Sequence, residues 1–419
     1  MLGFSFRMQE AVYIVSAVRT PIGKFGGGLA ELTAVDLGVI AVRAALDRAF
    51  GETPTPREPG SKLSEVSLRA TRYHVDELLF GHARPAGVGP NPARQIAWRA
   101  GLGDDAPAAT INQACASGLR AIIVACQQIR AGEAGIVVAG GTESMSRVPY
   151  LVEARWGFKM GHQPLVDVMH RDGFFCPMSQ MVMGETAEVL AEQYQISRDE
   201  QDRFALETQQ RAGRALAECR FQAEIAPVEK TDKKGNAVRV EKDEYVRADT
   251  TLASLAKLPP VFSKTGTVTA GNSSGLTDAA SALVLASEAK VRELGLQPLA
   301  RLVDSTMAAV EPRLMGIAPV PAVRKLESRT GWKLADYDAI ELNEAFAAQV
   351  IACDRELALD RARLNPNGGA IALGHPIGCT GARITTTLVH HLRRTGGKRG
   401  LATLCVSGGM GLALAVEAL

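Results

Sequence analysis

The sequence predicts an α/β fold, because short β-rich runs alternate with helical stretches along most of its length. The run VYIVSAV is followed by the helix-like VDLGVIAVRAALDRAF, then by VDELLFG and by a helix expected from about Pro92 to Ala100. A chain of 419 residues, 46% of them hydrophobic, can bury a large core. At typical domain sizes it should hold two or three folding units.

The clearest unit surrounds Cys115. A strand ending near Asn112 leads to a helix expected from about Ser117 to Arg130, and the apolar strand GIVVAGG follows. The pattern predicts a strand, a turn that carries a cysteine, a helix and a second strand.

The same order of elements returns near the carboxyl end of the sequence. A Gly-rich turn, NPNGGAIALGHPIG, precedes a helix expected from about Gly381 to Arg394 and two closing strands. VDELLFG likewise has a counterpart in YDAIELNEAFAAQV. The match predicts two similar halves built on one topology.

A segment of different character separates the halves. SRDEQDRFALETQQRAGRAL predicts a capped amphipathic helix, and EKTDKKGNAVRVEKDEYVR predicts an exposed hairpin. The Gly/Ser/Thr-rich stretch that follows suits close approach of the backbone to a ligand. We expect the chain to divide into residues 1–146, 147–266, 267–299 and 300–419, with the third part returning to the first half.

Charge and cysteine content restrict the partners. Lys and Arg number 47 against 45 Asp and Glu, so the chain lacks the basic field that nucleic-acid binding usually needs. No apolar run reaches the roughly 18 residues of a membrane-spanning helix, and the start lacks a signal-peptide pattern. The seven cysteines include no C-x-x-C pair, which argues against disulfides and a common zinc site. We expect a cytoplasmic protein.

Three residues at predicted strand ends could carry chemistry. Cys115 precedes a helix whose free N–H groups favour the thiolate, and His375 lies in a Gly-rich turn stiffened by Pro376, where it could act as a base. Cys405 ends the strand LATLCVSGGMG, whose glycines leave N–H groups free to face an oxyanion. Taken singly, either cysteine could be core packing and the histidine could be structural. Together, a nucleophile, a base and a second acid/base suit carbon–carbon acyl transfer.

Four segments in order, NQACASG, NEAFA, GGAIALGHPIGCTGAR and CVSGGMG, closely resemble the signature blocks of thiolases. VRTPIGKFGG, GPNPARQ, MGETAE and TVTAGNSSGLTDAA fit the same family, so the resemblance spans nearly the whole chain. It implies two mixed-sheet halves in a layered αβαβα thiolase fold, with an inserted loop domain that covers coenzyme A. The implied enzyme is an acyltransferase of fatty acid metabolism and β-oxidation. It cleaves 3-ketoacyl-CoA to acetyl-CoA and a shortened acyl-CoA, or runs the reverse Claisen condensation.

The resemblance implies a role for each matching residue. Cys115 would be the acylated nucleophile, His375 its base, and Cys405 the acid/base at C2 of the substrate. Asn343 would hold a water that joins His375 in one oxyanion hole. Backbone N–H groups of Cys115 and Ser407 would form the other; many members have glycine in place of Ser407, but the backbone donor survives the change.

Coenzyme A is implied as a substrate, with no bound cofactor and no metal. Arg247 and Ser254 resemble positions beside the adenine nucleotide, with Leu258 as an apolar contact. The remaining implied contacts are Ala270 and Ser274 on the pantetheine, and Met183 and Phe346 at the thioester end.

The resemblance leaves assembly and substrate less sharply defined. GFKMG followed by VDVMHRDG resembles the loop of tetrameric, biosynthetic-type members, so we expect a homotetramer in preference to a dimer. GCTGAR resembles degradative 3-ketoacyl-CoA thiolases, whereas the GFKMG loop resembles acetoacetyl-CoA thiolases. Val182 also stands where acetoacetyl-specific members often have histidine. Acyl-chain length and reaction direction therefore stay open.

Three other interpretations were weighed against the resemblance. A ketoacyl-ACP synthase would pair its cysteine with two histidines, which Cys405 argues against. A non-catalytic acyl-CoA carrier of this fold should have lost Cys115, His375 or Cys405, and all three are present. A dinucleotide dehydrogenase would need G-x-G-x-x-G between a strand and a helix, which neither GKFGGGLA nor GVGPNPARQ supplies.

Overall fold

The computed structural model describes residues 10–52, 55–58, 73–231 and 234–419. Residues 1–9, which belong to the start examined for a signal peptide, lie outside the described residues, as do residues 232–233 of the expected hairpin. No helix in the described part of the chain is long and apolar enough to cross a membrane.

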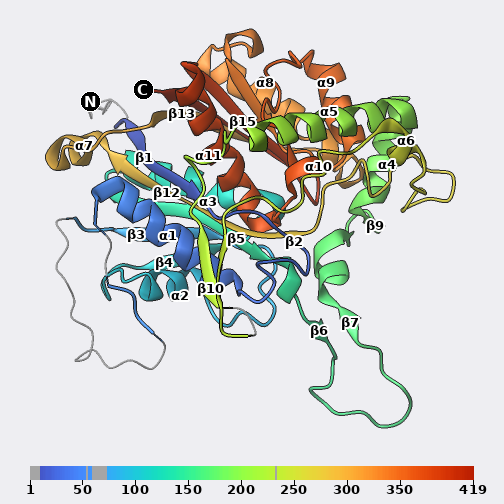
Figure 1. Cartoon of the computed structure of the whole chain (residues 1–419), viewed down its shortest axis with the longest axis horizontal. Coiled ribbons are helices and arrows are strands. Elements are labelled where there is room, and N and C mark those ends of the chain that lie inside the picture. Colours follow the sequence, from blue (N-terminus) through green and yellow to red (C-terminus); the bar gives the residue numbers. More distant parts are fainter. Residues whose placement is uncertain (1–9, 53–54, 59–72, 232–233) are drawn as a thin grey trace, which may run out of the picture.

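In the first half, a mixed sheet runs in the order β4–β3–β5–β12–β1, and the short strand β2 pairs with β12 beside this path (Figure 1). β3 runs parallel to β4 and β5, whereas β12 is antiparallel to β5 and β1. β12, the strand that follows the inserted segment, therefore pairs with strands of the first half. The bounds are β1 Val12–Arg19, β2 Gly23–Lys24, α1 Ala34–Phe50, β3 Glu77–Gly81, α2 Pro92–Arg99, β4 Ala108–Ile111, α3 Ser117–Ala131, β5 Ile136–Ser144, β12 Thr277–Ser287 and α7 Glu288–Leu294.

The second half continues the sheet in the order β14–β15–β16–β13. β13 pairs with β1 between Ile14–Ala300 and Val12–Leu302, which joins the two halves edge to edge. An isolated parallel bridge between Ile340 and Leu364 lies beside β14, as β4 lies beside β3. The bounds are β13 Ala300–Ala309, α8 Pro319–Thr330, β14 Ala339–Leu342, α9 Ala347–Leu357, α10 Ala370–Leu373, α11 Ile377–Thr395, β15 Arg399–Val406 and β16 Met410–Ala418.

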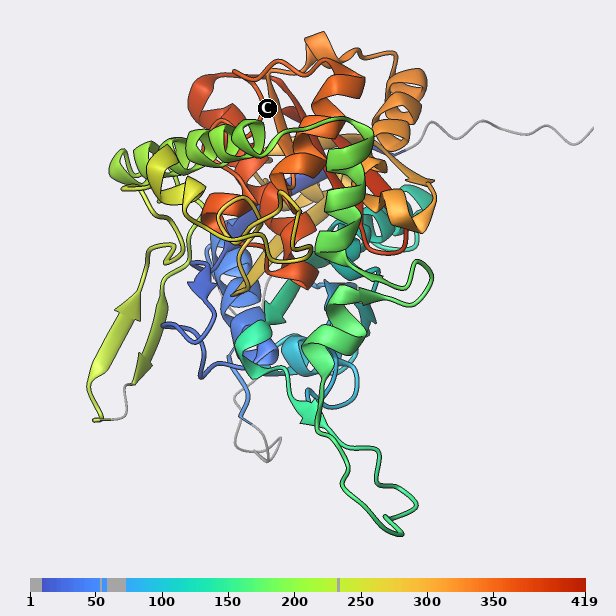
Figure 2. The same cartoon turned by 90° about the vertical axis from the view of Figure 1, so that its right-hand side faces the viewer.

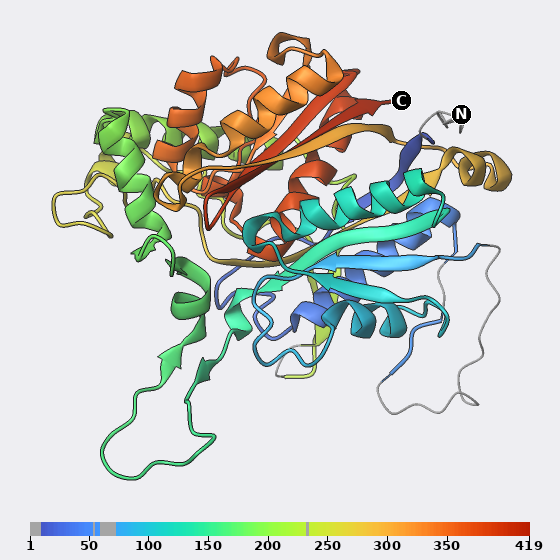
Figure 3. The same cartoon turned by 180° about the vertical axis from the view of Figure 1, so that it is seen from behind.

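The two halves repeat one order of elements, which confirms the predicted similarity. The order in the first half is β1, α1, β3, α2, β4, α3, β5 and β12. The order in the second half is β13, α8, β14, α9, then Leu364 with its bridge to β14, then α11, β15 and β16. In both halves the helix that precedes the two long final strands lies at the centre of the molecule (Figures 1 and 3).

Three of the apolar clusters in the core define five layers. One cluster joins α3 and α11 to strands of both halves. A second packs α1 and α2 against the first half of the sheet, and a third packs α8 and α9 against the second half. The arrangement is therefore αβαβα, with α3 and α11 as the middle layer.

The central helix α11 begins earlier than the sequence indicated, at Ile377 instead of about Gly381. Glycine disfavours helix interiors, but here it permits close contact between helices. A Cβ on Gly381 would lie 2.4 Å from the backbone nitrogen of Leu119, and one on Gly118 would lie 2.9 Å from that of Ala382. Packing against α3 therefore outweighs the local propensity of the glycines.

The inserted segment forms helices and hairpins at one side of the two halves, and its long loop projects from the body (Figure 2). The expected capped helix is α5, with Ser197 as its N-cap. Its elements are β6 Tyr150–Leu151, β7 Val166–Asp167, a π-helical turn His170–Phe174, β8 Phe175–Cys176, β9 Met181–Val182, α4 Met183–Gln193, α5 Arg198–Ala217, β10 Val228–Thr231, β11 Ala237–Val240 and α6 Leu252–Ala256. β10 and β11 pair as the predicted hairpin.

A buried ionic cluster fastens the inserted segment to the sheet. Arg19, at the end of β1, is fully buried and bonds Glu224 at 2.5 Å and Asp243 at 2.7 and 2.9 Å. Because removal of one partner would leave a buried charge uncompensated, the cluster holds the insertion in one position over the site.

Gly381→Ala tests the close packing of the central helices. The added methyl has no room beside Leu119, so we expect it to lower the free energy of unfolding by about 1–3 kcal/mol, measured by chemical denaturation. Gly213→Ala is the matched control, because Gly213 is also in a helix but a Cβ there would meet only Ala248, at 3.0 Å. Equal effects of the two substitutions would contradict the packing argument.

Candidate active site

Cys115 lies in a tight turn between β4 and α3. The 3₁₀ turn Ala114–Ala116 precedes the helix, and Ala114 has a left-handed φ of 45°. Ser117 fixes the turn, since its hydroxyl accepts the N–H of Gln113 at 2.9 Å and donates to the carbonyl of Ala114 at 2.7 Å. Strain of this kind is held only where the surroundings impose it, and here it directs Cys115 toward a cavity.

His375 lies at the corresponding place in the second half, just before α11. Its backbone N–H donates to the carbonyl of Gly275 at 3.0 Å. Its Nδ1 lies 2.6 Å from the hydroxyl of Thr380, which itself donates to the carbonyl of Pro376 at 3.1 Å. Because that hydroxyl has one proton, it accepts from Nδ1–H, and the other ring nitrogen, Nε2, is left as a proton acceptor.

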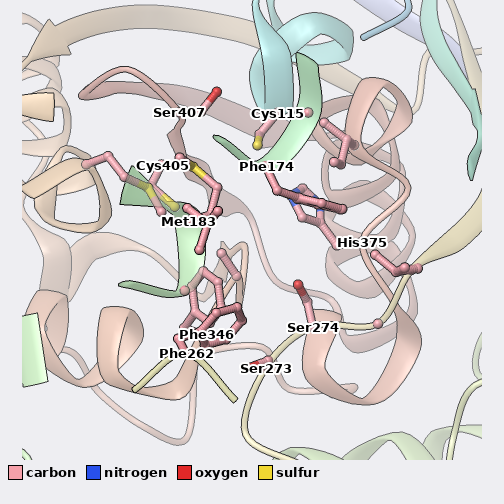
Figure 4. A pocket seen from close by; sticks show the side chains of 18 of the residues that line it. Cys115, Phe174, Met183, Phe262, Ser273, Ser274, Phe346, His375, Cys405 and Ser407 are labelled. Atoms are coloured by element: carbon pink, nitrogen blue, oxygen red, sulfur yellow. The ribbon is translucent and has the colours of Figure 1, made fainter. Parts of the chain in front are cut away.

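The two residues meet at an apolar cavity of about 430 Å³ (Figure 4). The side chains of Cys115, His375 and Cys405 point into one space in this view. Seven of the residues expected from the sequence line this cavity: Cys115, Met183, Ser274, Phe346, His375, Cys405 and Ser407.

The site holds its thiol and imidazole in their neutral forms. Burial raises the pKa of the Cys115 thiol, although Arg84 and the N–H groups of Ser407 and Cys115 act in the opposite direction. The expectation that the helix start would favour the thiolate is therefore outweighed by desolvation. Burial, then the charges of Arg383 and Arg84, lower the pKa of His375 to about 3. A neutral imidazole facing a protonated thiol can serve as its base.

Cys405 is a second protonated thiol at the same cavity. It lies in β15 opposite Gly411, and it is buried. Burial, then the nearby Cys115, raise the pKa of Cys405 well above its ordinary value. Ser407 follows in the turn to β16, where Gly408 and Gly409 have φ of 87° and 81°, a conformation that glycine adopts without strain.

Asn343, which the resemblance implies as the holder of a water beside His375, does not line the cavity. It follows β14, and its backbone N–H donates to the carbonyl of Thr403 at 3.0 Å. Its side chain is 1% exposed, and neither polar atom has a partner among the described residues. Buried amides are normally hydrogen-bonded, so this side chain is free to bind a small polar group.

The residues expected at the nucleotide end of coenzyme A gather in a separate pocket of about 250 Å³. Arg247, Ser254 and Leu258 line it, and so does Ala270, for which the resemblance implies a contact with the pantetheine instead. The hydroxyl of Ser254 already donates to the carbonyl of Thr251 at 2.7 Å, in the cap of α6. Ala270 therefore lies with the nucleotide-end residues, whereas Ser274, expected beside it on the pantetheine, lines the main cavity.

Sequence reasoning missed several walls of the cavity and one anchoring residue. The added walls include His170, Phe174, Val261, Phe262 and Met315. Glu143 is buried, and its carboxylate accepts the N–H of Gly378 in α11 at 2.8 Å and those of Ala83 and Arg84 at 3.2 Å. Glu143 could have been found from the sequence, because an acidic residue that continues the apolar run GIVVAGG is unusual in a buried strand. The sequence motifs indicate only a subunit contact for the segment around His170.

The described residues offer no evident metal site, since no group of three or more His, Cys, Asp or Glu among them could hold an ion. Fold and site together define an α/β protein with two similar halves. Cys115 lies just before the central helix α3 of the first half, and His375 lies just before the central helix α11 of the second half. Both side chains reach one apolar cavity beside a second cysteine.

Comparisons with known proteins identify the family. The model of the thiolase N-terminal domain matches residues 12–53 and 62–289, and that of the thiolase C-terminal domain matches residues 296–418. The chain belongs to the thiolase family, which sets aside the dinucleotide dehydrogenase interpretation.

Relatives agree over nearly the whole length. An acetyl-CoA acetyltransferase of Cupriavidus necator is 47% identical over 97% of this chain and 99% of its own. The crystal structure of the Bacillus anthracis acetyl-CoA acetyltransferase has a TM-score of 0.90 at 44% identity, covering 98% of this chain and 99% of the other. Human mitochondrial 3-ketoacyl-CoA thiolase in complex with CoA has a TM-score of 0.90 at 41% identity, with the same coverage.

Thr380→Val tests the fixed tautomer of His375. The substitution removes the acceptor of Nδ1–H with little change of shape, so we expect kcat for thiolysis to fall by at least about tenfold. Thr385→Val is the matched control, because its buried hydroxyl on the same helix bonds only the carbonyl of Gly381, at 2.9 Å. Similar kcat values for the two variants in a steady-state assay would show that Thr380 does not orient the base.

Proposed function

We propose that this chain cleaves 3-ketoacyl-CoA with free coenzyme A, or condenses two acyl-CoA molecules in the reverse direction, through an acyl group carried on Cys115. The observation that carries the proposal is the convergence of Cys115, His375 and Cys405 on one apolar cavity. A non-catalytic acyl-CoA carrier would have no need of a nucleophile, a base and a second thiol in such an arrangement.

The first half of the reaction breaks the C2–C3 bond. Nε2 of His375 takes the proton of Cys115, and the sulfur attacks C3 of the ketoacyl group. The bond between C2 and C3 then breaks, its electron pair passes to C2, and Cys405 donates a proton there. Acetyl-CoA leaves, and the shortened acyl group remains as a thioester on Cys115.

The second half returns the enzyme to its starting state. Cys405, now a thiolate, takes the proton of an incoming coenzyme A, whose sulfur attacks the thioester. The acyl group passes to coenzyme A, and the sulfur of Cys115 regains its proton from His375. A thiol suits the exchange at C2 because a single sulfur atom can give a proton to C2 and then, as the thiolate, take one from coenzyme A.

Two oxyanion holes are proposed to stabilise the negative charge that develops. Asn343 would hold a water beside His375 in one hole, which is supported by its buried and unpartnered side chain. The backbone N–H groups of Cys115 and Ser407 would form the other, and both already act on the sulfur of Cys115. Donors fixed in advance avoid the cost of reorganisation when charge appears.

Residues 147–266 are proposed as the domain that covers coenzyme A, between the half at 1–146 with its return at 267–299 and the half at 300–419. This segment contributes Arg247, Ser254 and Leu258 to the nucleotide-end pocket and Met183 to the cavity. Ser274 and Phe346 would contact the pantetheine and the thioester. The human relative solved with CoA supports coenzyme A as a substrate.

We also propose a homotetramer that works in the cytoplasm, in fatty acid metabolism that includes β-oxidation. Support for the assembly comes from the projecting loop, where Trp156 is 96% and Met160 is 92% exposed (Figure 2). Large exposed apolar side chains of this kind mark contact surfaces. The seven cysteines are all free thiols, which suits a reducing compartment.

Replacing each cysteine separates their roles by chemical step. Cys405→Ala should still take an acetyl group from acetyl-CoA onto the Cys115 peptide, although more slowly, because a coenzyme A thiolate can leave without the proton that Cys405 supplies, whereas a carbanion at C2 cannot. Its thiolysis should fall on the order of 100-fold or more. Cys115→Ala should show neither acetylation nor thiolysis. Intact-mass and peptide analysis beside a thiolysis assay measures both.

The control for this experiment is the wild-type enzyme exposed to acetyl-CoA under the same conditions. An acetyl group found on Cys405 in the wild type, or normal thiolysis by Cys405→Ala, would overturn the division of labour. Loss of acetylation in a folded Cys405→Ala variant would show that coenzyme A cannot leave without a proton from Cys405, and the two cysteines would then not be separated by chemical step.

The assembly is tested by replacing the apolar tip of the projecting loop. We expect the double substitution of Trp156→Ser and Met160→Ser to reduce the particle from tetramer to dimer in light scattering, because it removes apolar contact area. Lys159→Ser, an exposed polar position on the same loop, should leave the tetramer intact. A tetramer that survives the double substitution would exclude this loop as its contact.

A further inference from the structure

Arg84 is a buried cation beside the cavity that the reaction steps above do not use. It follows β3 and is 5% exposed. Nη1 donates to the carbonyl of Ala83 at 3.1 Å and Nη2 to that of Gly173 at 2.9 Å, whereas Nε has no partner in the described part of the chain. Its guanidinium makes no ion pair with a carboxylate among the described residues, although buried charges are usually paired.

The surroundings of Arg84 connect it with Cys115. Ala83, the preceding residue, packs in one small cluster with Cys115, Phe174 and Ile377. The guanidinium carbon lies 5.9 Å from the centre of the Phe174 ring, and Phe174 lines the cavity with Cys115. Arg84 is therefore connected with Cys115 through two neighbours, Ala83 and Phe174, which both pack in the cluster that contains the thiol.

The field of this cation favours negative charge on sulfur. Arg84 is the largest electrostatic influence that opposes the rise in the pKa of Cys115 caused by burial. Water would screen the charge of Arg84, but solvent screens buried groups such as Arg84 much less.

We propose that Arg84 is a positioning residue that supplies a fixed positive charge to the thiolate of Cys115. The S–H bond of Cys115 breaks, its proton forms an N–H bond at Nε2 of His375, and the electron pair stays on sulfur. Arg84 stabilises that sulfur anion through space. Through its bond to the carbonyl of Gly173 it also holds Phe174 in the cavity wall. This inference rests on the proposed role of Cys115 as the nucleophile.

Other titratable groups facing Cys115 set the sign of the test. Glu143, from β5, opposes Arg84, since its charge raises the pKa of Cys115. Nδ1 of His82 lies 3.1 Å from Oε1 of Glu143. Burial lowers the pKa of His82, but the effect of Glu143 is in the opposite direction, and the net result is a raised pKa. The remaining groups are His375 before α11, Cys405 in β15 and His170 in the π-helical turn.

The experiment measures alkylation of the Cys115 peptide by iodoacetamide across a pH series. Arg84→Met keeps the length and apolar contact of the side chain but removes its charge, whereas Arg84→Lys keeps the charge. We expect the midpoint of alkylation to move upward by roughly one pH unit or more in Arg84→Met, and to stay near the wild-type value in Arg84→Lys. Iodoacetamide is neutral, so steering of the reagent does not contribute.

The exposed Cys219 in the same samples is the internal reference, and its midpoint should not change. An unchanged Cys115 midpoint in Arg84→Met, or equal shifts in Arg84→Met and Arg84→Lys, would overturn the proposal. If Arg84→Met does not fold, Glu143→Gln replaces it. Removal of that negative charge should move the midpoint downward, and no movement would count against the electrostatic account.

The test is separate from that of the proposed function, because alkylation requires no turnover. Failure of Arg84 to influence the midpoint leaves the acetylation of Cys115 intact. Failure of acetylation, in contrast, would remove the nucleophile while the alkylation result stood as a property of the thiol.

Discussion

The close contact between α3 and α11 is the constraint on which the site depends. Each helix belongs to a different half, and glycines at Gly118 and Gly381 bring their backbones together where a Cβ would collide. Because α3 begins just after Cys115 and α11 begins just after His375, this contact sets the separation of the proposed nucleophile and its proposed base. A five-layered core then holds both helices between two half-sheets, which leaves little freedom for either residue to move.

The pKa shifts at the cavity result mainly from the burial of its titratable groups away from water. Both thiols have raised pKa values and His375 has a lowered one, with burial as the main cause each time. The resting reactive groups are therefore neutral, and charge appears only as protons move. Such a site needs donors and fixed charges arranged in advance. In the proposed reaction, the N–H of Ser407, the tautomer set by Thr380 and the cation of Arg84 would meet that need without entering the reaction themselves.

The site is formed by the two halves and the inserted segment together. The halves supply Cys115, His375 and Cys405, whereas the insertion supplies the apolar walls Phe174 and Phe262 and most of the nucleotide-end pocket. The ionic cluster of Arg19 ties this segment to β1. Glu143 in turn holds the start of α11 through the N–H of Gly378. Buried polar contacts thus fix the parts whose relative position matters for chemistry, while the projecting loop is left exposed (Figure 2).

The sequence by itself determined the α/β class, the similar halves and the turns that carry Cys115, His375 and Cys405, because alternation of apolar runs and the positions of glycines are local properties. It also supplied the motifs from which the family was inferred. Only the tertiary structure decided that α11 starts at Ile377, that Ala270 lies apart from Ser274, and that burial outweighs the helix start at Cys115. Arg84, Glu143 and Phe174 likewise became visible only there. Their effects depend on distances between segments far apart in the chain and on the exclusion of water. Neither can be predicted from a local sequence pattern.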